Sequence, residues 1–338
     1  MLRIGNIELP FSAYLAPMAG VSDLSFRMLN RSFGCVLAYT EMISAHALAY
    51  GNPRTLRMLA SDPSDRPLGV QLIDADESFL VRAVEKLEGY GFDLLDFNAG
   101  CPVRKVVRRG EGAALLRNPT YLEGLLRALV RASSVPVTVK IRLGWDESSI
   151  NAREVALRAE DAGVAAICVH GRTKAQGYSG TVDYDAIREV KGAVGIPVIA
   201  SGDVFSADVA ATIQGRTGCD GVAVARGALG NPWIFRDLLA FHGSAARGGR
   251  PASEEVAATM RRHFALSVNQ HGEVVGRINF RKFVPYYTKG LLNAKKVRDW
   301  AFHATSAAEM LEIIDEIATL SWATGKEGTR SPVRTVSP

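Results

Sequence analysis

Long apolar runs are missing from this chain of 338 residues. A transmembrane helix needs about 20 consecutive apolar residues, and no run reaches that length, including the amino-terminal MLRIGNIELPFSAYLAPMAG. Paired cysteines are missing as well, since no CxxC spacing occurs among Cys35, Cys101, Cys168 and Cys219. Neither a disulfide framework nor a zinc site is predicted, and we expect a cytoplasmic protein with no metal ion and no membrane contact.

A charge excess is absent from residues 1 to 243, which hold 26 basic and 26 acidic side chains. The net charge of +5 therefore comes from the remainder of the chain. Within it, the segment Arg261 to Arg298 has nine basic residues and one acid, whereas Asp299 to Glu316 has five acids and no base. This asymmetry predicts either a polyanionic partner for the basic segment or an ordinary solvated helical surface.

Eight short apolar or β-branched runs recur over the first 240 residues, with amphipathic stretches such as DESFLVRAVEKLEGYG between them. Strands that are apolar throughout and alternate with helices predict a parallel sheet, and eight such units can close a barrel. The main alternative, an open doubly wound sheet, lacks its GxGxxG turn after the first run. We predict an α/β fold, a (β/α)8 TIM barrel, with strands at 13–18, 35–41, 68–73, 93–98, 137–142, 165–170, 197–201 and 221–225.

The sequence changes character after the eighth run. The small and glycine-rich segment SAARGGRPASEE is typical of a linker, and the segments beyond it show helical periodicity without a strand pattern. We therefore predict a catalytic barrel over 1–242, a small all-helical domain over 253–325 that contains the basic segment, and a disordered tail over 326–338.

Polar or glycine-rich residues stand at every predicted strand end, where barrel enzymes carry their active sites. The last two of these loops, ASGD and ARGALG, predict a phosphate site, because glycine amides and a helix start can meet an anion. Lys140 lies inside an apolar strand, so we expect either an ion pair with a carboxylate of a neighbouring strand or a position beside a bound electron-rich ring or phosphate. His170, at another strand end, is either a satisfied core histidine or a residue of the pocket.

Cys101 follows the fourth predicted strand in DFNAGCPVRKVVRRGEGAALL. A free thiol has a pKa near 8.5, so Cys101 could donate a proton, whereas a nearby cation would make it a nucleophilic thiolate. The other three cysteines lie within or before apolar strands and are predicted to be small core residues.

Eight segments taken together resemble the tRNA-dihydrouridine synthase family, and they occur in the family's order over most of residues 10 to 240. They are APMAGVSDLSFR, TEMIS, VQLI, DFNAGCPVRKVVRRGEGAALL, VKIRLGW, VHGRTKAQGYSG, IASGDVFS and VARGALGNPWIF. The later segment INFRKFVPYYTKGL also resembles the basic helical domain of the bacterial branch once grouped with nitrogen-regulation proteins, the DusB type.

The resemblance implies an FMN-containing barrel that uses NADPH, or NADH, to reduce the C5=C6 bond of specific uridines in tRNA. Hydride would pass from reduced FMN to C6, and Cys101 would give a proton to C5. The resemblance assigns to the flavin the residues Pro17, Met18, Ala19, Gln71, Lys140, His170, Ser201, Gly202, Asp203, Ala225, Arg226 and Gly227.

The same resemblance implies tRNA as the partner of a chain that we expect to be a monomer. Its predicted substrate contacts are Asn98, Arg142 and Arg172 in the barrel and Arg281, Lys282 and Lys289 in the basic segment, where phosphates would be gripped. The basic residues that follow Cys101 either contact RNA as well or belong to a loop that is only solvated; they are Arg104, Lys105, Arg108 and Arg109.

Two other functions share parts of this pattern. A flavin enzyme acting on a free pyrimidine, similar to dihydroorotate dehydrogenases, has the same barrel and cysteine but gives no reason for a basic helical domain. A non-enzymatic RNA-binding regulator explains the basic segment and predicts a preparation without the yellow colour of flavin.

Overall fold

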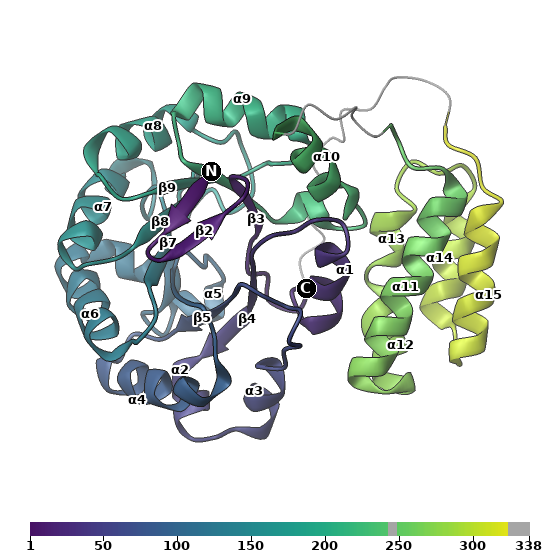
Figure 1. The fold of residues 1–338 in the computed structure, drawn as a ribbon, viewed down its shortest axis with the longest axis horizontal. Helices are drawn as coiled ribbons and strands as arrows, with labels where there is room; N and C mark the ends of the chain where they lie inside the picture. Colours follow the sequence, from purple (N-terminus) through teal and green to yellow (C-terminus); the bar gives the residue numbers. More distant parts are fainter. Residues whose placement is uncertain (243–248, 324–338) are drawn as a thin grey trace.

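A computed structural model describes residues 1–242 and 249–323. Eight parallel strands close into a barrel in the order β10-β3-β4-β5-β6-β7-β8-β9, so the TIM-barrel prediction is confirmed (Figure 1). The strands are β3 (Ala13–Leu15), β4 (Ala38–Ser44), β5 (Leu68–Ile73), β6 (Leu94–Ala99), β7 (Val137–Arg142), β8 (Ala166–His170), β9 (Val198–Ser201) and β10 (Gly221–Val224).

One strand is displaced from its predicted position. The sequence predicts 35–41, whereas β4 runs from Ala38 to Ser44. Cys35 still belongs to the turn after the preceding helix, because its backbone N–H donates to the carbonyl of Asn30 at 3.1 Å. As a consequence Glu41 lies inside the strand rather than at its end.

The barrel strands are covered by helices that follow them in the chain. The amphipathic stretch DESFLVRAVEKLEGYG, predicted between two strands, is confirmed as α4 (Glu77–Leu87). Its buried side chains Leu80, Ala83, Val84 and Leu87 follow the helical period. The barrel helices are α1 (Leu24–Arg31), α2 (Ala45–Ala49), α3 (Pro53–Met58), α4 (Glu77–Leu87), α5 (Arg104–Val107), α6 (Pro119–Ala132), α7 (Ala152–Asp161), α8 (Tyr184–Ala193), α9 (Ala207–Thr217) and α10 (Trp233–His242).

A short hairpin, absent from the sequence prediction, closes the amino-terminal end of the barrel. Its strands β1 (Leu2–Ile4) and β2 (Ile7–Leu9) pair antiparallel and bury Leu2, Ile4 and Leu9 against the barrel interior. Gly5 makes the turn at φ +58°, and a Cβ there would lie 2.5 Å from Pro136, just before β7. The amino end is thus filled by apolar side chains, which leaves the carboxyl end for chemistry.

Within the described residues, five helices follow the barrel and pack together beside α1 (Figure 1). They are α11 (Ser253–His271), α12 (Glu273–Arg281), α13 (Val284–Tyr287), α14 (Ala294–His303) and α15 (Ala307–Ala318). The ring of Phe26 in α1 stacks on Phe283 with 5.4 Å between centroids, so an aromatic contact joins the two parts. Residues 244–248 of the predicted linker and all of the predicted tail fall outside the described residues. The domain boundaries therefore stay a prediction.

No helix in the described ranges is long and apolar enough to cross a membrane. Nor do those ranges contain a group of three or more His, Cys, Asp or Glu side chains that could hold a metal ion.

Candidate active site

A chain of hydrogen bonds runs from a buried carboxylate to the backbone of Cys101. The Asp96 carboxylate accepts from Gln71 Nε2 at 2.6 Å, and Gln71 Oε1 accepts from Asn98 Nδ2 at 2.9 Å. Asn98 Oδ1 in turn accepts from the backbone N–H groups of Gly100 and Cys101, at 3.1 and 2.9 Å. Because the carboxylate can only accept when ionised, it fixes the direction of both amides in the chain.

The thiol of Cys101 is partly exposed at the carboxyl end of β6. Burial raises its pKa, and this outweighs the lowering by a hydrogen bond from the Val103 backbone and by the charge of Arg142. The thiol is therefore protonated at neutral pH, as a proton donor requires.

The four cations that follow Cys101 do not form a group around the thiol. All four are exposed, and Arg109 pairs with Glu111 at 2.7 Å. The loop instead approaches Cys101 through Gly112, which has φ +60° and where a Cβ would lie 2.8 Å from the carbonyl oxygen of Cys101. The structure thus supplies no thiolate-stabilising cluster from Arg104, Lys105, Arg108 and Arg109.

Lys140 lies on β7 with its ammonium group directed to the barrel mouth. Its Nζ is 3.5 Å from the hydroxyl of Ser201, a long contact, and no carboxylate lies within ion-pair distance in the described part of the chain. The nearest acidic influence is the buried Asp96, whose pKa is raised by burial and lowered in part by Lys140. Of the two alternatives for this lysine, the carboxylate partner is not found among the described residues, and a bound ring or phosphate remains.

His170 ends β8 and is 9% exposed. Its Nε2 is buried and has no hydrogen-bond partner among the described residues. Burial, together with the charges of Arg142 and Lys140, holds its pKa well below the ordinary value, so the ring is neutral. A buried polar atom without a partner points to a group that completes the site when bound.

The two glycine-containing loops form a cradle at the ends of β9 and β10. Gly202 and Asp203 both have positive φ, +121° and +53°. The backbone N–H groups of Asp203, Arg226 and Gly227 find no acceptor within residues 1–242 and 249–323. At Gly227 a Cβ would lie 2.0 Å from the carbonyl of Val204, so the loops approach closely only with glycine there. Open amides next to one another are suited to an anion such as phosphate.

The two barrel arginines predicted to contact the substrate are buried among the strand-end loops. Arg142 and Arg172 are each 2% exposed. Arg142 donates to the carbonyls of Gly100, Thr173 and Gly177 at 2.9, 3.0 and 2.7 Å, which ties three loop segments together. Arg172 pairs with Asp203 at 2.5 Å, and Arg226 joins the same carboxylate at 2.7 Å.

Sequence reasoning did not select Tyr178, which covers this part of the mouth. The ring is 49% exposed, and the guanidinium groups of Arg142 and Arg226 lie 5.4 and 4.9 Å from its centroid. His170 lies edge-on at 6.2 Å. An aromatic residue following VHGRT in a strand-end loop was the available signal.

The loop after β3 reaches the helical bundle. It carries Pro17, Met18 and Ala19, and the N–H of Gly20 donates to the Glu41 carboxylate. Lys282, predicted to bind RNA, donates from Nζ to the carbonyl of Gly20, and burial lowers its pKa.

The other two predicted RNA contacts lie on the bundle as well. Arg281 donates from Nη2 to the carbonyl of Ala304, and Lys289 is exposed after α13.

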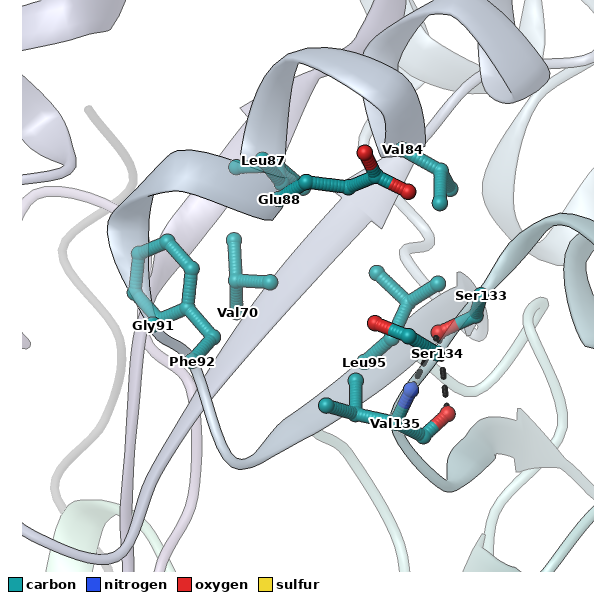
Figure 2. Close-up of a pocket in the computed structure, with 10 residues that line it drawn as sticks. All are labelled: Val70, Val84, Leu87, Glu88, Gly91, Phe92, Leu95, Ser133, Ser134 and Val135. Atoms are coloured by element: carbon teal, nitrogen blue, oxygen red, sulfur yellow. Dashed lines mark hydrogen bonds between the residues drawn. The ribbon is translucent and has the colours of Figure 1, made fainter.

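A hollow of about 170 Å³ lies away from this site (Figure 2). It is lined by residues of α4 and of the segments before β6 and β7, among them Phe92 and Val135, at the amino end of the barrel. Its walls are mainly apolar and carry none of the side chains of the candidate site, so we do not connect it with catalysis.

Solved structures show the same fold in more distant proteins. The 6-hydroxypseudooxynicotine amine oxidase of Pseudomonas geniculata aligns over 76% of this chain with a TM-score of 0.57 and 15% identity. Histamine dehydrogenase of a Rhizobium species aligns over 77% with a TM-score of 0.54 and 14% identity. This chain spans about half of each, 52% and 50%, and identities this low show the fold alone.

Closer relatives cover nearly the whole chain. The probable tRNA-dihydrouridine synthase 1 of Synechocystis is 37% identical over 317 residues, which is 93% of this chain and 88% of the relative. The tRNA-dihydrouridine synthase B of Pseudomonas aeruginosa is 37% identical over 298 residues, 88% of this chain and 90% of the relative. Residues 14–322 match the family described as Dihydrouridine synthase (Dus), and this chain belongs to that family.

Proposed function

We propose that this protein reduces uridine in tRNA to dihydrouridine, with FMN as its cofactor and NADPH as the reductant. The proposal rests on one observation: a protonated Cys101 lies at the same barrel mouth as polar groups that have no hydrogen-bond partner among the described residues. Membership of the dihydrouridine synthase family supports the same reaction.

The residues of the mouth fit a flavin mononucleotide. The open amides of Asp203, Arg226 and Gly227 are suited to its phosphate, and Ser201, Gly202 and Ala225 complete that cradle. His170 Nε2 and Lys140 offer a hydrogen bond and a positive charge to the ring system, while Gln71 has a second amide hydrogen to offer its pyrimidine edge. Pro17, Met18 and Ala19 would lie along the ring.

When bound, FMN would supply a hydride, which carries two electrons and one hydrogen, to C6 of the C5=C6 bond. The side chains of this protein deliver the proton and orient the cysteine loop. Cys101 gives its thiol proton to C5, and Asn98 holds the backbone of the cysteine loop so that the thiol stays directed into the mouth. Lys140 places a positive charge where negative charge develops during the reaction. A proton must then return to Cys101 from solvent before the next turnover.

The helical bundle supplies most of the RNA affinity in this proposal. A uridine in folded RNA must leave its stack to reach a barrel mouth, so backbone contacts have to support the extrusion. The basic segment Arg261 to Arg298 lies in α11 to α14, and we propose that Arg281 and Lys289 contribute to it.

The test uses the purified protein, NADPH and tRNA transcribed without modification. We expect a yellow preparation that oxidises NADPH and forms dihydrouridine, detected by mass spectrometry of the digested tRNA. Turnover of free uracil or orotate in place of tRNA would favour the free-pyrimidine enzyme. A colourless protein that binds tRNA without turnover would favour the regulator.

A further inference from the structure

We propose that Arg117, Trp145 and Lys174 form a second RNA-backbone contact, which we name the rim cluster. This inference rests on the proposed function, because it assigns tRNA phosphates as the ligand. The three residues come from the loops that follow β6, β7 and β8, at the carboxyl end of the barrel.

The rim cluster is built around the Trp145 ring. Lys174 Nζ lies 4.1 Å and the Arg117 guanidinium carbon 4.9 Å from the ring centroid. Both distances are within the range of cation–π attraction, which holds the two charges in place. Two like charges gathered on one ring repel each other, so an anion between them is favoured.

Backbone contacts make the platform rigid. The N–H groups of Lys174 and Ala175 donate to the carbonyls of Gly144 and Trp145, each at 2.9 Å. At Gly144 a Cβ would lie 2.2 Å from the carbonyl of Ser149, so the loop closes tightly only with glycine. A rigid platform loses little entropy when a ligand binds.

The charge of the rim cluster is not neutralised by the protein. In the part of the chain that the structure describes, neither Arg117 nor Lys174 has a carboxylate within ion-pair distance. The acid beside Trp145 is Asp146, whose carboxylate accepts hydrogen bonds from Ser148 and Ser149 instead. The cations therefore stay available to an anionic ligand.

The position of the rim cluster on the barrel indicates that this anionic ligand is RNA. In the closed order of eight strands, β7 stands four places from β3, so the two lie on opposite sides of the mouth. The helical bundle packs beside α1, which follows β3, whereas Trp145 follows β7 (Figure 1). A tRNA with one nucleotide in the mouth would extend to both sides. The basic bundle and the rim cluster would then hold its backbone on either side of the uridine.

A physical link joins the rim cluster to the reacting residues. Arg142 bonds the carbonyl of Thr173, next to Lys174, and the carbonyl of Gly100, next to Cys101. A phosphate held at Lys174 therefore has a fixed relation to the loop that presents the thiol.

The test compares the double variant Arg117→Gln/Lys174→Gln with wild type in the full-length, flavin-loaded protein. We expect a higher KM for unmodified tRNA with kcat at saturating tRNA retained, because the contact is made equally before and during the reaction. The salt dependence of tRNA binding, as log Kd against log salt, is expected to become less steep by roughly 1 to 2. The matched control is Arg3→Gln, an exposed cation on the amino-end hairpin.

Each outcome separates this inference from the reaction itself. Dihydrouridine formation by the wild-type protein tests the proposed function, whereas the ratio of variant to wild type tests the rim cluster. An unchanged KM and salt slope, or an equal change in Arg3→Gln, would overturn the inference. Loss of NADPH-driven flavin reduction without tRNA, at unchanged tRNA affinity, would overturn it as well and assign the cluster to the nucleotide reductant.

Discussion

The barrel mouth and the junction between barrel and helical bundle are both polar, but they differ in how many of their groups are paired. At the junction several side chains bond across the contact, although His263 Nε2 has no partner among the described residues. At the junction, Gln270 Oε1 accepts from the N–H of Ser25 at 2.7 Å, and the His271 ring lies 3.0 Å from the Asp23 carboxylate. At the mouth, His170 Nε2 and three backbone N–H groups have no partner among the described residues.

This difference separates architecture from function. A buried polar group without a hydrogen bond costs about 1 to 3 kcal/mol, and at the mouth several such groups lie together where one ligand could complete their bonds. Changes at the mouth should therefore reduce the reaction with little effect on folding. Changes at the junction should reduce stability with little effect on the chemistry.

The largest expected effect at the mouth is that of Cys101→Ala. Loss of a positioned proton donor should lower dihydrouridine formation roughly 10²- to 10⁴-fold, while flavin content and NADPH oxidation in single turnover persist. In the wild type, the raised pKa of the thiol keeps the donor protonated through neutral pH, and activity should fall as pH rises through that pKa.

The matched control for this change is Cys219→Ser at the other end of the barrel. Cys219 donates to the carbonyl of Gly221 at 3.1 Å, and a hydroxyl can replace that bond. We expect activity to be kept. Full dihydrouridine formation by Cys101→Ala would remove the cysteine from the mechanism.

Asp96→Asn should have the next largest effect, because it disturbs the direction of the amide chain. The amide of asparagine at position 96 can direct its NH2 group toward Gln71. The Gln71 amide can then reverse, which places its own NH2 group opposite the Asn98 Nδ2 donor. Loss of alignment at the cysteine loop is expected to lower kcat roughly tenfold to a hundredfold. Stability should not fall, since a buried charge is removed.

Thr138→Val provides the comparison, measured by the same kinetics and by urea unfolding. The Thr138 hydroxyl donates to the other Asp96 oxygen at 2.6 Å, outside the amide chain. We expect a smaller loss of kcat than for Asp96→Asn. Equal losses would indicate that packing around the carboxylate matters rather than amide direction.

Acid should weaken the junction through His263. The ring is fully buried, lies 4.5 Å from the Phe283 ring between centroids, and has Tyr287 Oη 3.0 Å from its Nδ1. Burial is the main cause that lowers its pKa to about 4. The nearby Asp23 raises the pKa and Lys282 lowers it, each by less than burial does. Between pH 6.5 and 4, His263 binds a proton in the unfolded chain but stays neutral in the folded chain, so stability falls as pH falls.

The expected loss of unfolding free energy between pH 7 and pH 5 is about 2 kcal/mol. Urea unfolding at both pH values measures it. In His263→Phe this part of the pH dependence should disappear, even if the unpaired Tyr287 hydroxyl lowers stability at both. An unchanged difference between the two pH values in the variant would assign the acid sensitivity to other groups.

Much of the fold could be predicted, because apolar strands alternating with amphipathic helices leave few arrangements. The hairpin was missed since strands of three residues, such as Leu2–Ile4, carry too little pattern to recognise. At the site, strand-end position identified Cys101, Lys140 and His170 but could not give the direction of a side chain. Arg142 stands at such an end, yet its guanidinium is taken up by loop carbonyls.

The side-chain contacts between the barrel and the helical bundle could not be predicted. The bond between Ser25 and Gln270 joins residues 245 positions apart, and no local pattern signals it. The same applies to Lys282, which the sequence groups with the other cations of the basic segment. Only the fold brings its ammonium group to the loop after β3.

Lys282 and Lys289 give the smallest and sharpest test of the comparison. Lys282→Gln removes a junction contact and should lower stability by about 1 kcal/mol or less, because much of the residue is exposed, while the salt slope of tRNA binding stays the same. Lys289→Gln, at an exposed position after α13, should make that slope less steep by roughly 1. Filter binding across a salt series, with urea unfolding of the same samples, measures both. If the two variants change the slope equally, then Lys282 contacts RNA despite its bond to Gly20, and paired groups at the junction also serve the substrate.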